Sequence, residues 1–174
     1  YAVVGRRYDS AGNPIGGEFQ INTYTTGNQY LPSVVMGSTG SFVVVWSSPQ
    51  DGSSAAIMGR RYDSAGTPLG AEFQINTYTT GYQGSPKIGM DGSGNFVVVW
   101  NSPRDGSFFG VAARRYNSSG TALGNEFQVN GYTTNYQAFP RVAMEPAGSF
   151  VVVWFSPQDG SGYGAIGERF TSGG

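Results

Sequence analysis

The sequence predicts an all-β protein made of tandem, four-stranded antiparallel repeats of 54 residues. Three observations lead to this prediction. An apolar five-residue stretch occurs three times, an Arg-Arg-Tyr motif returns at a constant interval, and no segment has a convincing helical period.

The apolar stretch reads Phe-Val-Val-Val-Trp and occupies residues 42–46, 96–100 and 150–154. Five β-branched and aromatic residues are too few for a buried helix and suit a strand. Successive side chains of a strand point to opposite faces, so Val43 and Val45 face away from Trp46 and its partners. Both faces are apolar, and each therefore needs a covering sheet.

The Arg-Arg-Tyr motif fixes the period. It stands at 6–8, returns 54 residues later at 60–62 and again at 114–116, and a weaker Glu-Arg-Phe copy follows at 168–170. A constant period without insertions is typical of repeat architectures such as solenoids and propellers.

The middle copy is expected to contain four strands, A to D, at residues 87–90, 95–100, 109–116 and 123–130. Tight turns, such as Asp91-Gly92-Ser93-Gly94, separate them. Strand D alternates apolar and polar residues, which indicates an outer strand. Four antiparallel strands in about 50 residues are typical of a β-propeller blade, with strand B buried between neighbouring blades.

The chain forms one array, with predicted units at 1–54, 55–108 and 109–162 and an extra terminal strand at 163–174. Closed propellers usually have four to eight blades, so three units should not close alone. Two chains forming a six-bladed ring, a piece of a longer propeller, and open stacking into a filament all remain possible. Because the chain begins at Tyr1, inside a predicted strand, we expect a processed chain or a piece of a longer one.

The composition limits the possible partners. Charged residues make up 12% of the chain, about half of the usual share, and the formal net charge is −1. Without a basic run, nucleic-acid binding is not expected. There is no Cys for a disulfide framework, and no apolar stretch reaches the length of a membrane span.

The longer loops, for example 48–53 and 22–27, are predicted to share one end of the array, where a ligand would bind. Aromatic rings there could stack on sugars. The candidate ligand-binding residues are Tyr24, Tyr78, Tyr132, Trp46, Trp100 and Trp154. The alternative is that the Trp residues belong to the core and the Tyr residues cover the ends of the blades.

Two sets of charged residues are further candidates. Asp51, Asp105 and Asp159 each precede a Gly and suggest calcium as a possible cofactor. The signal is weak, because each loop supplies a single carboxylate, whereas calcium needs six to eight oxygens. A simple Asp-Gly turn is the alternative. Of Arg60 and Arg61, one is expected to reach Glu72 and the other to lie over an aromatic ring.

The chain has no His and no Cys, which removes the commonest general base and most zinc sites. Carboxylate pairs, as in glycoside cleavage, remain available. However, most carboxylates follow the 54-residue period, whereas catalytic residues normally break a repeat's symmetry. The sequence therefore predicts that the protein is not an enzyme.

Four motifs carry a resemblance that covers almost the whole chain. They are Phe-Val-Val-Val-Trp at 150–154, Gln-Asp-Gly-Ser-Gly-Tyr-Gly at 158–164, the segment 61–70 and Glu-Phe-Gln-Val-Asn at 126–130. The repeat resembles the tandem repeats of very large secreted or surface proteins of bacteria. The resemblance implies an extracellular or cell-surface location and no catalytic residues.

These observations favour a structural or adhesive protein that assembles with copies of itself into a filament or ring. Glycans are further possible partners. The alternative is a carbohydrate-binding propeller lectin, and the third possibility is a polysaccharide-active enzyme.

Overall fold

The structure is a computed structural model that describes residues 1–52, 54–106 and 108–174. In this part of the chain every regular element is a strand. The strands are β1 (Val4–Tyr8), β2 (Pro14–Gln20), β3 (Tyr30–Met36), β4 (Phe42–Ser48), β5 (Ala56–Tyr62), β6 (Phe73–Gln74), β7 (Gly84–Met90), β8 (Phe96–Ser102), β9 (Gly110–Tyr116), β10 (Phe127–Gln128), β11 (Ala138–Met144), β12 (Phe150–Ser156) and β13 (Gly164–Phe170).

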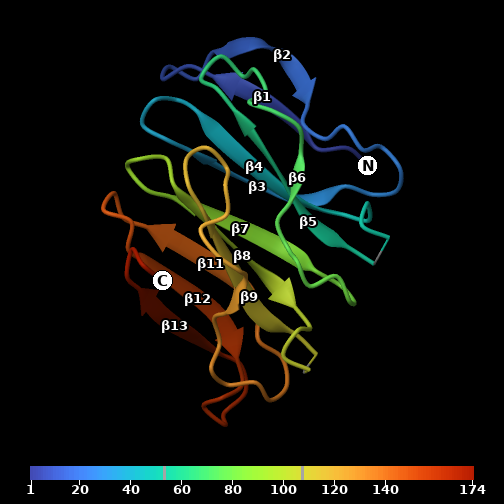
Figure 1. The fold of residues 1–174 in the computed structure, drawn as a ribbon, viewed down its shortest axis with the longest axis vertical. Helices are drawn as coiled ribbons and strands as arrows, with labels where there is room; N and C mark the ends of the chain where they lie inside the picture. The colour runs from blue at the N-terminus through green and yellow to red at the C-terminus, as the bar shows by residue number, and fades with distance from the viewer. Residues whose placement is uncertain (53, 107) are drawn as a thin grey trace.

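The strands form four antiparallel sheets, each made of strands that are consecutive in the chain. Two complete sheets, β3–β6 and β7–β10, lie between a two-stranded sheet, β1–β2, and a three-stranded sheet, β11–β13. The sheets follow one another from the N-terminal end of the molecule to its C-terminal end (Figure 1). This arrangement confirms the predicted all-β, propeller-like fold.

The central strands β4 and β8 are buried on both faces, as predicted. In β12 only the face of Phe150, Val152 and Trp154 is buried, and the opposite face leaves Val153 exposed. Val43 and Val45 of β4 join a cluster with Ile88 of the following sheet. Phe42 and Trp46 point the other way, into a cluster with residues of the preceding sheet. The Phe-Val-Val-Val-Trp strands β4 and β8 therefore each join two hydrophobic cores, which explains why both of their faces are apolar.

Two details differ from the sequence-based expectations. Strand D is much shorter than 123–130, because the chain leaves β9 near Gly124, where φ is 158°, and returns only for Phe127–Gln128. The last strand belongs to the third sheet, where one edge of β13 pairs with β12 from Ser156↔Gly164 to Phe150↔Phe170 and the other edge pairs with none of the described strands. The last sheet of the array therefore contains three strands, β11, β12 and β13.

The connections gather at two ends of the array. A Cβ placed on Gly40, in the β3–β4 turn, would lie 3.1 Å from the Ser64 side chain in the β5–β6 turn, so these tight turns share a turn end. A Cβ placed on Gly27 would lie 2.8 Å from Pro49, so the longer connections share the other end, here called the loop end. Ser53 and Ser107, within the predicted loops, lie outside the described residues.

Repeated hydrogen bonds join each unit to the next. Arg60 Nη1 and the Tyr62 hydroxyl both donate to the carbonyl oxygen of Ile21, at 2.8 and 3.1 Å. The Glu72 carboxylate accepts from the backbone N–H groups of Thr23 and Tyr24, at 3.0 and 3.1 Å.

The predicted Arg–Glu72 ion pair is therefore wrong, because the carboxylate reaches the preceding connection instead. The predicted stacking is confirmed, with Arg60 5.7 Å from the ring centroid of Tyr62. Among the described residues, no helix is long and apolar enough to span a membrane.

Candidate functional site

The three predicted tryptophans lie inside the cores rather than at a surface. Trp46 and Trp100 are fully buried and Trp154 is nearly so. The indole Nε1 of Trp100 donates to Gln83 Oε1 at 3.2 Å, which satisfies its polar atom within the core. An enclosed indole offers no face to a ligand, so this position matches the core alternative.

The three predicted tyrosines are half-buried at the loop end, one in each unit. The side-chain amide of the Asn two residues earlier donates to each tyrosine's carbonyl oxygen, at 2.7 Å for Tyr24 and 2.9 Å for Tyr78 and Tyr132. The turn that presents each tyrosine is therefore fixed by its own unit. Ligand contact by these three rings remains a prediction.

The aspartates of the calcium hypothesis support loop structure. Asp105 Oδ2 accepts from Asn130 Nδ2 at 3.3 Å, and a Cβ on Gly110 would overlap the Asp105 carboxylate. Asp159 accepts from the backbone N–H of Ser161 at 3.0 Å, and Asp51 lies 3.5 Å from Gln74 Nε2. Across 1–52, 54–106 and 108–174, no three His, Cys, Asp or Glu side chains group to hold a metal ion. The geometry adds no support to calcium, which stays a prediction.

A different set of aromatic side chains comes together at the loop end, and we call it the aromatic row. Its members are Tyr82, Phe109, Tyr136, Phe139, Phe155 and Tyr163. The ring centroid of Phe109 lies 5.7 Å from that of Tyr82 and 5.5 Å from that of Tyr136. Tyr136 lies 6.3 Å from Tyr163 and 6.2 Å from Phe139. Most pairs meet edge to face, the geometry that aromatic rings prefer.

The row breaks the symmetry of otherwise similar repeats. In the last copy the four equivalent positions are all aromatic: Tyr136, Phe139, Phe155 and Tyr163. In the middle copy they are Tyr82, Ser85, Asn101 and Phe109, and in the first copy Asn28, Leu31, Ser47 and Ala55. The core stretch does not change between copies. An increase in aromatic residues from the first copy to the last, at positions outside the constant core stretch, indicates a property that folding alone does not require.

The backbone helps to expose one member of the row. Leu31, Ser85 and Phe139 occupy the same position in β3, β7 and β11, and all have positive φ, between 53° and 56°. Each lies at a β-bulge, where the register with the next strand shifts. Such a conformation is costly for a residue with a side chain and is often found at functional sites. At Phe139 it leaves about half of the side chain exposed.

A cavity of about 390 Å³ adjoins the exposed end of the row. It is lined by Phe108, Asn135, Tyr136, Pro157, Gly162 and Tyr163. None of these side chains carries a charge at neutral pH. Burial and the neighbouring phenol of Tyr163 raise the pKa of Tyr136, and burial and the phenol of Tyr30 raise the pKa of Tyr82 to about 12. Both phenols are therefore protonated at neutral pH and able to donate a hydrogen bond.

This chemistry suits an uncharged ligand with both flat apolar faces and hydroxyl groups. The ring faces of Tyr136 and Tyr163 can pack against C–H groups, while the phenols and the Asn135 amide can pair with hydroxyls. The earlier sequence reasoning missed these residues because it considered only positions that all three copies share. Comparing the copies for differences would have found them.

No protein-family model matches the chain, and no curated protein sequence matches it. Solved structures do share its fold. They include a protein of unknown function from Dyadobacter fermentans (13% identity, 86% of this chain and 40% of that one, TM-score 0.61). The Hadza microbial sialidase is also similar, with 14% identity over 84% of this chain and 36% of that one and a TM-score of 0.60. The endo-arabinase of Bacteroides thetaiotaomicron shares 12% identity over 95% of this chain and 64% of that one, with a TM-score of 0.53. The chain spans less than two thirds of each of these proteins.

These comparisons contradict two of the predictions above. The proteins of known activity that share the fold include a sialidase, an endo-arabinase and, in Fusarium graminearum, an α-L-arabinofuranosidase (17% identity, TM-score 0.54). The predictions of a self-assembling adhesive protein and of a non-enzyme are therefore corrected. The error lay in excluding an enzyme because most carboxylates follow the 54-residue period, since glycoside cleavage needs only one pair of carboxylates.

Proposed function

We propose that the chain supplies blades to a carbohydrate-active β-propeller and that the aromatic row binds sugar rings of a polysaccharide. The observation that carries this proposal is the row itself: an uncharged set of partly exposed rings beside a cavity at the loop end, at positions that are not aromatic in the first copy. Arabinan and sialylated glycans are the first ligands to test, since similar folds are described as acting on these classes.

The proposed role is recognition of the polysaccharide. Cleavage would require two carboxylates on either side of a glycosidic bond. Several carboxylates of the chain already accept backbone hydrogen bonds within turns or between units, as Asp9 and Glu126 do. The proposal also places the protein outside the cell or at its surface, where it would encounter polysaccharides.

A panel of immobilised polysaccharides tests this function. We expect retention of the protein on arabinan or on a sialylated glycan, and weaker retention after Tyr163→Ala. Loss of one stacking ring should lower the affinity by about threefold to tenfold. Tyr24→Ala, at a half-buried tyrosine outside the row, is the matched control and should leave retention unchanged.

Absence of retention on every polysaccharide, with the protein folded by circular dichroism, would contradict the proposal. Release of reducing ends from a bound polysaccharide would extend the proposal from recognition to cleavage.

A further inference from the structure

The N-terminal end of the array carries an apolar groove that the proposed function does not use. The groove has a volume of about 570 Å³ and lies between the β1–β2 sheet and β3. Tyr8, Ile15, Val34 and Met36 line it and are exposed. Exposed apolar surface of this extent usually marks a binding surface.

The interior of the same molecule contains the same groove in a filled state. Six residues of its wall recur exactly one period later around a second cavity, between the β3–β6 and β7–β10 sheets. The groove residues are Arg7, Tyr8, Ile15, Met36, Gly40 and Ser64, and their counterparts are Arg61, Tyr62, Leu69, Met90, Gly94 and Ser118. The second cavity measures only about 230 Å³.

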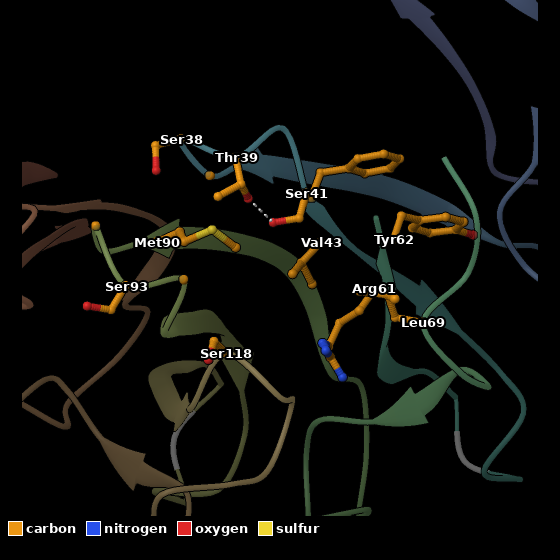
Figure 2. Close-up of a pocket in the computed structure, with 14 residues that line it drawn as sticks. Ser38, Thr39, Ser41, Val43, Arg61, Tyr62, Leu69, Met90, Ser93 and Ser118 are labelled. Atoms are coloured by element: carbon orange, nitrogen blue, oxygen red, sulfur yellow. Dashed lines mark hydrogen bonds between the residues drawn. The ribbon is translucent and has the colours of Figure 1, made fainter. Parts of the chain in front are cut away.

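The β3–β4 hairpin is what fills the interior copy. Gly37, Ser41 and Val43 of this hairpin form part of that cavity's wall. Figure 2 shows Ser41 and Val43 above the cavity with Met90 of the following unit beside them. A Cβ on Gly37 would lie 3.1 Å from the Met90 sulfur, so the hairpin and the following unit are in direct contact.

Burial at equivalent positions measures what the hairpin covers. Val34 is 61% exposed, whereas its counterpart Ile88, packed against Val43 and Val45, is 8% exposed. Tyr8 is 57% exposed, whereas Tyr62 is 1% exposed.

The strand beside the groove also has an open edge. β5 pairs with β6 on one side and with β4 on the other, through Phe42↔Tyr62 and Val45↔Gly59. β1, its counterpart, pairs with β2, and among the described strands none pairs with its other edge. An open edge next to an apolar groove can accept a strand by backbone hydrogen bonding.

We propose that this groove binds a β-hairpin of the repeat's own pattern, equivalent to residues 30–48, supplied by a further repeat. In the register of β4 on β5, the hairpin's Phe would stack on Tyr8, and its Trp would lie opposite Val4. The first and third Val residues of Phe-Val-Val-Val-Trp would cover Val34. This surface is separate from the aromatic row and does not depend on sugar binding.

The chemistry of the groove favours this occupant. Its walls are mainly apolar, and of the two arginines there Arg7 already donates to the Ser64 carbonyl oxygen at 2.6 Å. An acidic partner would gain little, while a hairpin satisfies the β1 edge and the apolar wall together.

The test uses a synthetic peptide with the sequence of residues 30–48, labelled for fluorescence anisotropy, and the whole chain. We expect saturable binding, with the affinity about tenfold lower for the Val34→Asp protein, because the carboxylate would be buried without a partner. A peptide carrying Val43→Asp and Val45→Asp should bind no better than a scrambled one. Tyr163→Ala, at the far end of the array, is the control and should not change the affinity.

A second arm avoids dependence on peptide solubility. The same hairpin, with its following loop, is fused ahead of Tyr1, and the fused chain should melt several degrees higher than the chain alone. The Val34→Asp change should remove that gain. No binding together with no gain in melting temperature would overturn the proposal. Formation of concentration-dependent dimers would also overturn the proposal if Val34→Asp abolishes the dimers and the peptide does not disperse them. That result would assign the groove to a second copy of the chain.

Discussion

The ring of Tyr62 lies flat on the ring of Phe42, with a centroid distance of 4.8 Å and an interplanar angle of 6°. Tyr116 and Phe96 repeat the pair at 5.0 Å and 9°. Because Tyr62 is also buried between two sheets, we expect Tyr62→Ala to lower the free energy of unfolding by about 3–5 kcal/mol. Urea denaturation followed by tryptophan fluorescence measures this loss.

Tyr8 provides the control, since it occupies the same position in the first copy and is exposed. Tyr8→Ala should change the free energy of unfolding by no more than about 0.5 kcal/mol. Equal losses at Tyr8 and Tyr62 would show that the stack contributes little.

The buried Glu126 connects two units. Its carboxylate accepts from the backbone N–H groups of Thr77 and Tyr78, at 2.6 and 3.2 Å, and pairs with Arg104 at 3.2 Å. Glu126→Gln keeps the size but removes the charge and one acceptor, so we expect a loss of about 1–3 kcal/mol in the free energy of unfolding.

Glu18 is the matched position in the first copy, and it is exposed. Glu18→Gln should have almost no effect in the same urea titration. A neutral Glu126→Gln variant would mean that water replaces the inter-unit hydrogen bonds without loss.

Burial of phenols makes stability depend on alkaline pH. Burial raises the pKa of Tyr116 from 10.0 to about 12, so the folded state holds the proton more tightly than the unfolded state does. The resulting stabilisation is complete below pH 10 and is lost as the pH rises from 10 to 12. Thermal melts at pH 9, 10 and 11 should show a falling melting temperature, and Tyr116→Phe should make the fall smaller. A melting temperature that is constant over this range would contradict the assignment.

The β-bulge at Ser85 stores backbone strain, because φ is 55° there. A β-branched residue tolerates this conformation poorly, so Ser85→Val should lower the free energy of unfolding by about 1–2 kcal/mol. Ser85→Gly removes the strain but adds freedom to the unfolded chain, and the two effects should nearly cancel. A Val variant as stable as the Gly variant would mean that the bulge relaxes. Thermal unfolding of the two variants side by side gives the answer.

The cores could be predicted from the sequence because each depends on a local pattern. The alternation within Phe42–Trp46 was sufficient to assign Val43 and Val45 to one core and Trp46 to the other. Strand D could not be predicted to its correct length. The predicted strand extended over 123–130 because Phe127 and Val129 alternate with polar neighbours, but only Phe127–Gln128 pairs with β9 as a strand.

The candidate site was harder to predict because it depends on contacts between copies. Phe109 precedes a strand of the β7–β10 sheet and Tyr136 precedes the first strand of the next sheet, so they meet only when these two sheets pack together, and no local pattern indicates that contact. The same holds for Glu72, whose partners lie 48 and 49 residues away. Both classes of contact are set by the angle between neighbouring sheets, which local sequence does not specify.

Under the proposed function, the aromatic row binds sugar and the Tyr24–Tyr78–Tyr132 set does not. Isothermal titration of the protein with an arabino-oligosaccharide or a sialylated oligosaccharide tests it most directly, using Tyr136→Ala and Tyr132→Ala. Both changes remove one half-buried tyrosine from the same connection. Our account predicts an affinity lower by about threefold to tenfold for Tyr136→Ala and an unchanged affinity for Tyr132→Ala. The reverse order, or no heat of binding with any variant, would contradict it.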